Sequence, residues 1–473
     1  MKMKMVVLLP FCFQASLAFR SVLWHSHAAS VTVFSEKTNM QRKARPLPEL
    51  PVLPAGPAAA IKRTLTAEQN AERELDCQHF DVCSGCGYDR ELTHTPRMNQ
   101  ARAFLGLNVT LDTSSGWRTH AKLAAGPRSK FGGVQLGLYE SRSHSIRSIP
   151  ACAVHAPTIN TAAGAVEAAC HEAGVSGFSE REGGGMLRYV QLSVEEASGL
   201  VQVTLVWNAE SYRDASPHAQ RLLKRLRANN PDLFHSIWFH WRTGDGNAIF
   251  ARGEKKWHRA YGPEFLLESL LVEAELANDL TRTKKLPVFH FSPMVFRQAN
   301  LGGFSKIIDS VVSMVKPGDV VCELYAGIGL IGLSVLARSK VGQVRCSDQN
   351  PYNLRCFEQS LKSLDSGLAA QAGYVVASAE EALLDLGEAD GANVIIVDPP
   401  RKGLEPAVLE CLCRGEEVTS VDTLIYVSCG FEALQRELPV LANAGWIIES
   451  SSGYALFPGS DHIETLVILR RPI

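Results

Sequence analysis

Two patterns of apolar and polar residues divide the chain. From Phe291 onward, short apolar runs alternate with helical stretches, which predicts an α/β domain with a parallel sheet. Residues 185–275 instead contain stretches in which apolar and polar positions alternate, such as 187–192 and 201–205, and these indicate strands of a β-rich, α+β domain. One helix is expected in the same region, and its basic residues are Arg221, Lys224, Arg225 and Arg227.

Composition adds little to this division. The chain has 473 residues, 46% of them apolar, which fits two or three globular units. The net charge of −1 provides no general field that would attract nucleic acid, so any such contact has to come from local patches. Because no segment reaches about 18 uninterrupted apolar residues, we expect no stable membrane association.

The first residues have the composition of a targeting segment. Lys2 and Lys4 precede an apolar run, and the stretch that follows is rich in Ser, His and Arg. This favours a presequence over residues 1–35, and an organellar destination in which the plastid is preferred to the mitochondrion, with secretion as an alternative. Five prolines then indicate a linker over residues 36–76.

A glycine-containing loop follows the first strand of the α/β region. Residues 320–324 form a short apolar run, and Tyr325-Ala326-Gly327-Ile328-Gly329 leads into a helical stretch. Glycines at this place allow a ligand to approach the start of a helix. The spacing to Gly332 leaves a dinucleotide site open, whereas the acidic Glu323 favours a cofactor that carries a sulfonium and an amino group.

Acidic residues end two further strands. Asp348 follows the run 343–347, where it could accept hydrogen bonds from ribose hydroxyls or cap the next helix. Asp398 ends the run 393–397 and precedes two prolines and Arg401, so it is placed either to meet a substrate or to form a structural turn. The glycine loop and the ribose alternative for Asp348 together predict a nucleoside-bearing cofactor.

A thiol and a last carboxylate complete the candidate chemistry. Cys429 is the last residue of the strand expected over residues 424–429, and a helix starts directly after it, so the helix dipole should favour the thiolate. Its place beside a cofactor-type sheet favours a chemical role over inert packing. Alternation along the final strand places His462 and Glu464 on one partly buried face. Glu464 is therefore a candidate base, or else one half of a structural salt bridge.

Cysteines cluster near the start of the β-rich region. Cys77, Cys83 and Cys86 have the spacing of metal ligands, and either an iron–sulfur cluster or zinc needs a fourth. Aromatic residues stand next to cations in three stretches, 116–122, 238–242 and 255–259. Such stretches either bind unpaired bases and phosphates or are core aromatics beside a solvated face.

Five motifs in a fixed order produce a family resemblance over residues 286–473. They are Phe-Ser-Pro through Phe-Arg-Gln-Ala-Asn at 291–300, Glu-Leu-Tyr-Ala-Gly-Ile-Gly at 323–329, Asp-Pro-Pro-Arg-Lys-Gly at 398–403, Val-Ser-Cys at 427–429, and Phe-Pro-x-x-x-His-Ile-Glu at 457–464. The chain resembles the RNA (uracil-5-)-methyltransferase family. The resemblance implies a Rossmann-like class I methyltransferase domain at 286–473, preceded by an iron–sulfur and central RNA-binding domain at 77–285.

The resemblance also implies the site residues and their partners. Cys429 would be the nucleophile and Glu464 the proton acceptor, while S-adenosylmethionine and the uracil would lie among Gln298, Tyr325, Asp348 and Asp398. A [4Fe–4S] cluster would be held by Cys77, Cys83, Cys86 and Cys152. Cys152 is preferred to Cys170 because it follows a strand, and zinc or a vestigial site are the alternatives. The expected product is 5-methyluridine in tRNA or rRNA, made by a monomer from an unpaired or flipped uridine.

Two departures from the family pattern leave other functions open. Gly430 and Phe431 follow the nucleophile where Asn-Pro is frequent, and Leu330 stands where Asn is frequent. The alternatives are a methyltransferase that acts on another base or a small molecule, for which Cys429 would be dispensable, and a non-catalytic RNA-binding iron–sulfur protein.

Overall fold

The computed structural model describes residues 75–128, 133–244, 248–270, 286–415 and 417–471. The expected presequence and nearly all of the expected linker therefore lie outside the described residues. Among the helices within those ranges, none is long and apolar enough to cross a membrane.

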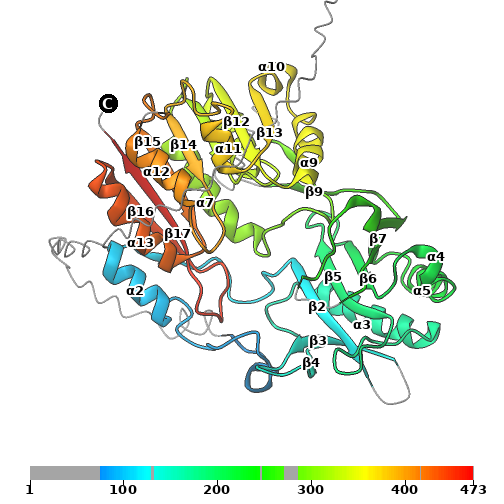
Figure 1. Ribbon diagram of the computed structural model, residues 1–473. Helices are drawn as coiled ribbons and strands as arrows, with labels where there is room; N and C mark the ends of the chain where they lie inside the picture. Colours follow the sequence, from blue (N-terminus) through cyan, green and yellow to red (C-terminus); the bar gives the residue numbers. More distant parts are fainter. Residues whose placement is uncertain (1–74, 129–132, 245–247, 271–285, 416, 472–473) are drawn as a thin grey trace, which may run out of the picture. The chain divides into compact units, whose positions relative to one another are not determined.

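The C-terminal part of the chain is built on a mixed eight-stranded sheet (Figure 1). The strand order is β1-β16-β17-β15-β14-β11-β12-β13. The five strands from β13 to β15 are mutually parallel, and β17 runs antiparallel to both of its neighbours. The strands are β1 (Val109–Thr110), β11 (Val320–Leu324), β12 (Gln343–Asp348), β13 (Ala372–Val376), β14 (Val394–Val397), β15 (Thr423–Ser428), β16 (Ile447–Tyr454) and β17 (Glu464–Arg470).

Helices cover both faces of this sheet. Alternate residues of β14 show the two layers, because Ile396 belongs to one apolar cluster and Ile395 to the other. Strands covered on both faces are expected to be mainly apolar, and the fully buried β14 and β15 fit this expectation. The first cluster contains α7 (Leu301–Met314), α8 (Leu330–Ser339) and α9 (Pro351–Leu361), and the second contains α11 (Ala379–Leu384), α12 (Pro406–Arg414) and α13 (Phe431–Asn443). The short α10 (Ser366–Ala369) precedes β13. The predicted α/β, Rossmann-like class is confirmed.

A second sheet of seven strands occupies the central part of the chain, in the order β4-β3-β2-β5-β6-β7-β8. All its neighbours are antiparallel except β6 and β7, which α4 (Tyr212–Ala215) and α5 (His218–Asn229) connect. The helix α5 is the basic helix that the sequence predicts. The strands are β2 (His120–Pro127), β3 (Val134–Tyr139), β4 (Ile146–Ser148), β5 (Leu187–Val194), β6 (Val201–Trp207), β7 (Phe234–Trp241) and β8 (Trp257–Tyr261), and α3 (Pro157–Ala173) packs against three of them.

The segment before the central sheet joins the C-terminal sheet instead. The helix α2 (Pro96–Leu105) packs against α13, and β1 pairs in parallel with β16. Met98 and Ala101 of α2 are buried in a small apolar cluster with Phe431 and Ile463. The expected domain boundary at residue 286 stays a prediction, but the chain crosses between the two sheets before reaching it.

A two-stranded ladder, β9 (Leu266–Ser269) and β10 (Val288–Phe291), lies between the two large sheets in the sequence. Glu268 of β9 forms an ion pair of 2.5 Å with Arg297, and both side chains are 3% exposed. Glu268 also accepts a hydrogen bond from the backbone N–H of Glu196, which follows β5 of the central sheet. This buried pair therefore fixes the segment that leads into the C-terminal sheet.

Candidate active site

Three candidate side chains meet at one edge of the eight-stranded sheet. Asp398 and Cys429 directly follow the parallel neighbours β14 and β15. Glu464 begins the antiparallel β17, and the pairing of Ser428 with Thr465 sets it next to Cys429. The carboxyl ends of parallel strands are the usual ligand site of such sheets. The structure thus brings together a thiol and two carboxylates that are 31 or more residues apart in the sequence.

The electrostatics of the edge oppose ionisation of all three groups. Burial, and then the carboxylates of Glu464 and Asp398, raise the pKa of Cys429 to about 12. Burial and Asp398 raise the pKa of Glu464 well above its usual range, and burial raises that of Asp398. The expectation that the helix dipole makes Cys429 a thiolate is wrong in this respect, because desolvation and two neighbouring acids outweigh it.

Arg401 is the charge that partly offsets these acids. Its guanidinium lowers the pKa of both Cys429 and Glu464. The sequence alone assigned Arg401 no role beyond its place after the two prolines. A cation three residues after a strand-end carboxylate was the signal that could have identified it.

The two residues after Cys429 have clear packing roles. Gly430 lies so close to the Asp-Pro-Pro-Arg loop that a Cβ there would be 2.3 Å from the carbonyl oxygen of Arg401. Phe431 is 1% exposed and meets Phe104 of α2 edge-on, with 6.2 Å between the ring centroids. The departure from the family pattern thus fits the local packing and leaves Cys429 in place.

The expected position of His462 on the last strand is wrong. β17 begins at Glu464, so His462 belongs to the preceding loop and is half-buried. Alternation could not fix which side these residues face, because the first six residues of β17 are all buried. A central strand covered on both faces has no polar side to mark its register.

The glycine loop lies at the neighbouring strand end. The pairing of Leu324 with Val397 sets Tyr325 beside Asp398 at the same edge. Tyr325 has a φ of 58°, a backbone conformation that side-chain-bearing residues rarely adopt and that is concentrated at functional sites. Its hydroxyl donates a hydrogen bond to Glu405 at the start of α12. The loop is thus held in a strained form.

Asp348 closes this loop from the end of β12. One carboxylate oxygen accepts a hydrogen bond from the backbone N–H of Gly327 at 3.0 Å, and the other accepts one from that of Asn350 at 2.8 Å. The helix cap of α9 is Asn350, so the capping alternative for Asp348 is wrong. Each carboxylate oxygen has a further lone pair that could accept a ribose hydroxyl.

Glu323 does not face the loop, contrary to the expectation that it recognises a cationic cofactor. It is 2% exposed, and it accepts hydrogen bonds from the N–H of Gly332 at 2.8 Å and from the thiol of Cys346 at 3.2 Å. Burial raises its pKa to about 8, which favours the neutral form at pH 7. A Cβ on Gly332 would be 2.4 Å from Glu323, so this third glycine permits close helix–strand packing.

Gln298 lies in the segment between β10 and α7, which contacts both sheets. It is half-buried. Its neighbour Ala299 accepts a hydrogen bond from the N–H of Thr119, and Asn300 donates one to the carbonyl of Leu456. Met294 of the same segment accepts one from Asn350 at 3.4 Å, which connects the segment to the end of β12.

Comparison with known proteins agrees with this arrangement. A family model described as tRNA (Uracil-5-)-methyltransferase matches residues 384–472. An uncharacterized RNA methyltransferase of Protochlamydia amoebophila is 34% identical over 409 residues, which are 85% of this chain and 99% of that protein. The chain belongs to the RNA (uracil-5-)-methyltransferase family. The enzyme class indicated by the sequence, an S-adenosylmethionine-dependent RNA methyltransferase, is thereby confirmed.

Two further likenesses cover most of this RNA methyltransferase. An RNA methyltransferase of Halalkalibacterium halodurans is 24% identical over 416 residues, 84% of this chain and 83% of that protein. The crystal structure of a Pyrococcus abyssi tRNA (uracil-54, C5)-methyltransferase in complex with S-adenosyl-L-homocysteine has a TM-score of 0.60 and 22% identity, and the match covers 79% and 81% of the two chains. That structure therefore has the same fold.

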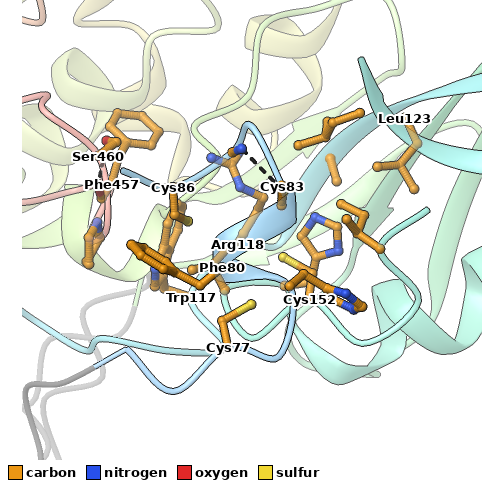
Figure 2. A pocket seen from close by; sticks show the side chains of 18 of the residues that line it. Cys77, Phe80, Cys83, Cys86, Trp117, Arg118, Leu123, Cys152, Phe457 and Ser460 are labelled. Atoms are coloured by element: carbon orange, nitrogen blue, oxygen red, sulfur yellow. Dashed lines mark hydrogen bonds between the residues drawn. The ribbon is translucent and has the colours of Figure 1, made fainter. Parts of the chain in front are cut away.

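The four cysteines expected to bind a cluster line one cavity of the methyltransferase. Cys77, Cys83, Cys86 and Cys152 all border a space of about 170 Å³, beside Arg118 (Figure 2). Burial, and then the other three cysteines, raise the pKa of Cys86 to about 12. Within the part of the chain that the structure describes, no group of three or more His, Cys, Asp or Glu is arranged to hold a metal ion. The cluster therefore stays a prediction.

The structure distinguishes the two candidates for the fourth ligand. Cys152 precedes α3 and borders the cavity, whereas Cys170 is fully buried within α3 in the central apolar core. Arg118 also places a cation in the cavity, and its charge lowers the pKa of Cys86. A cationic side chain among four thiols fits an anionic, thiolate-bound group.

The aromatic residues of the basic stretches are mostly core residues of the methyltransferase. Trp117, Trp238 and Trp241 are at most 5% exposed. They cannot stack on bases without unpacking, so the core alternative is confirmed for these three. Trp257 is half-buried, and it packs against His240 with 4.4 Å between ring centroids.

Proposed function

We propose that this enzyme forms 5-methyluridine in tRNA or rRNA, with Cys429 as covalent nucleophile and Glu464 as the base. The observation that carries the proposal is the meeting of Cys429, Glu464 and Asp398 at the sheet edge next to the glycine loop. A uracil ring is small enough to contact groups on adjacent strand ends. In an RNA duplex both faces of the uracil are covered by neighbouring bases, so the target uridine has to be unpaired or flipped out.

The uracil itself sets the requirements for these residues. Its C5 is too weak a carbon nucleophile to accept a methyl group directly. Addition of the Cys429 sulfur to C6 opens the C5–C6 double bond and leaves an enolate with an electron-rich C5. S-adenosylmethionine, when bound, supplies an electrophilic methyl group on its sulfonium. Glu464 then takes the proton from C5, the C5–C6 double bond re-forms, and the sulfur leaves C6 as thiolate.

Burial adapts the two carboxylates to proton transfer. The raised pKa values of Glu464 and Asp398 make both stronger proton acceptors than exposed acids. The thiol of Cys429, with a pKa of about 12, has to release its proton before it attacks C6, and the neighbouring carboxylate of Asp398 can accept it. Arg401 favours the charged forms of Cys429 and Glu464 and so supports both steps.

The residues around the glycine loop fit the cofactor. Asp348, held by two backbone N–H groups, has lone pairs for the ribose hydroxyls. Tyr325 and the backbone at Gly327 would border the cofactor, and Gln298 and Asp398 would lie between it and the uracil. None of these assignments requires Glu323.

The experiment uses RNA in which the target is 5-fluorouridine. With fluorine at C5 there is no proton for the base to remove, so the sulfur cannot leave C6. When the cofactor is present, the covalent protein–RNA complex should therefore persist and appear as a slowly migrating band in a denaturing gel. Wild type and the control Cys413→Ala, which removes a half-buried thiol of α12, should both form the complex. Cys429→Ala should form none. Methyl transfer to uridine by Cys429→Ala at the wild-type rate would contradict the proposal.

The cysteine cavity supports a second part of the proposal, a [4Fe–4S] cluster bound by Cys77, Cys83, Cys86 and Cys152. Its support is the shared cavity and the cation of Arg118 among the thiols. Methyl transfer needs no electron, so the cluster would be structural. Anaerobically prepared wild type and Cys170→Ser should contain about four irons per chain, and Cys152→Ser should lose iron. Stoichiometric zinc without iron would contradict this part.

A further inference from the structure

The cysteine-bearing segment directly contacts the loop that leads into Glu464. The backbone N–H groups of Gly87 and Tyr88 both donate hydrogen bonds to the carbonyl oxygen of Gly459, at 2.7 and 3.1 Å. Gly459 lies five residues before Glu464, in the loop between β16 and β17. Two donors on one carbonyl fix the position of this loop relative to the cysteine segment.

The contact is close enough to require glycine at position 459. Gly459 has a φ of 90°, and an added Cβ would be 2.9 Å from Leu75 and 3.1 Å from the Cys86 sulfur. Both a strained backbone and a collision with the cysteine segment would follow from any side chain here. The loop is therefore fitted to the cysteine segment.

The same loop forms a wall of the cysteine cavity. Phe457, Pro458 and Ser460 border that cavity, and Figure 2 shows Phe457 and Ser460 on the side of Cys86. The Phe457 ring meets Trp117 edge-on at 5.8 Å, and the Arg118 guanidinium lies over both rings, at 4.7 Å from Trp117 and 5.8 Å from Phe457. The cavity and the loop thus share one packed boundary.

The rest of the 457–463 loop also contacts the residues that follow the cysteine segment. Asp461 accepts a hydrogen bond from the backbone N–H of Arg97 at 2.9 Å. Ile463 is buried with Met98 and Leu107 in the cluster around α2. From Phe457 to Ile463, the loop therefore has contacts to residues 86–118, and Glu464 follows at once.

We propose that the segment Cys83–Tyr88 is a positioning element for Glu464: it fixes the 457–463 loop, and through it the carboxylate that removes the C5 proton. The inference rests on the proposed function. It assigns the cysteine region a role in one chemical step, proton removal, and none in the addition of Cys429. Gly87, Tyr88 and Gly459 are positioning residues and touch no reacting atom.

This separation of steps gives a distinctive signature. If Glu464 is displaced, Cys429 can still add to C6 and C5 can still be methylated, but the C5 proton stays and the sulfur cannot leave. A covalent complex with ordinary uridine RNA should then accumulate. A general loss of folding would lower every step and accumulate nothing.

The test compares Gly459→Ala with Gly445→Ala. Gly445 has a φ of 96°, but a Cβ added there would meet no other group within 4 Å, so both variants strain the backbone and only the first disturbs the cysteine segment. With uridine RNA and cofactor, Gly459→Ala should lose roughly 10- to 100-fold in kcat, keep its KM for RNA, and show the covalent complex in a denaturing gel. Gly445→Ala should turn over without it. Phe457→Leu, which removes the ring contact without a strained backbone, should show the same complex at a lower level.

The outcomes separate the inference from the proposed function. If Gly459→Ala and Phe457→Leu turn over without a complex while wild type is trapped by 5-fluorouridine RNA, the inference is wrong and the proposed function stands. If wild type is not trapped by 5-fluorouridine RNA either, both are wrong. Faster hydrogen exchange of the 457–463 amides in Gly459→Ala than in Gly445→Ala is also expected, and equal exchange would contradict the inference.

Discussion

The sheet edge and the cysteine cavity place their reactive side chains in different ways. At the edge, Asp398 and Cys429 follow neighbouring parallel strands, and strand pairing fixes their separation. In the cavity, Cys77 and Cys83 flank a single turn of 3-10 helix, η1 (Phe80–Val82), and Cys152 lies in a loop. Backbone ladders hold the first group, whereas loop packing holds the second.

This difference predicts different consequences of substitution. A side chain at the end of a buried strand can be replaced with little effect on the sheet, because the ladder remains. The position of a loop thiol depends on the packing of its neighbours. Replacing such a thiol should therefore disturb the packing around Trp117 and Phe457. Changes at the edge should therefore affect chemistry, and changes around the cavity should affect structure first.

The largest effect that tests this contrast between sheet edge and cavity is the loss of turnover expected for Glu464→Gln. Loss of the base should slow turnover by roughly 10²- to 10⁴-fold, while the buried amide keeps the packing of β17. Methylation kinetics and the melting temperature measure the two consequences. Glu449→Gln, which removes an exposed acid of β16 paired with Arg470, is the matched control and should be close to wild type. A strongly lowered melting temperature in Glu464→Gln would contradict the assignment of this residue to chemistry.

A smaller effect, on stability, is expected at the buried ion pair of Arg297 and Glu268, which fixes the segment leading into the C-terminal sheet. Arg297→Met leaves the 3% exposed Glu268 without its counter-charge, and breaking a buried pair in this way costs about 3–5 kcal/mol. The free energy of unfolding in urea measures it. The exposed pair of Arg414 and Glu410 provides the control, because Arg414→Met should change stability by less than about 1 kcal/mol. Equal stability of the two variants would show that the fold does not depend on the pair of Arg297 and Glu268.

The smallest effect is a shift in the pH dependence at the edge. Asp398 raises the pKa of both Glu464 and Cys429, and both must lose a proton to act. Asp398→Asn removes this negative charge, so the rise of the residual kcat/KM with increasing pH should move to lower pH. The exposed Asp385→Asn should leave the profile unchanged. A shift to higher pH would contradict the electrostatic account.

Strand-end chemistry could be predicted from the sequence because it depends on local pattern. Asp398 and Cys429 each end a run of apolar residues, and such a run both forms a buried strand and marks its last residue. For Glu464, the alternation that suggested a candidate base carries no information, because β17 is buried on both faces. Only the family motif gives a sound reason for selecting this residue.

Features that depend on long-range packing could not be predicted. The inward orientation of Glu323 follows from the approach of Gly332 and Cys346, and the pairing of β1 with β16 joins residues more than 340 positions apart. The raised pKa of Cys429 likewise comes from burial and from acids on two other segments. The spacing of three cysteines in the sequence predicts that they act together, but the contact between Cys86 and the loop at Gly459 appears only in the folded structure.

The most direct test of the central claim identifies the residue that bonds to the uracil. Wild-type protein is trapped with 5-fluorouridine RNA and cofactor, digested with protease and nuclease, and the linked peptide is sequenced by mass spectrometry. The account predicts one nucleotide, carrying an added methyl group, on the sulfur of Cys429. A nucleotide linked to another residue, or full methylation of uridine RNA without any linked peptide from the trapped sample, would contradict it.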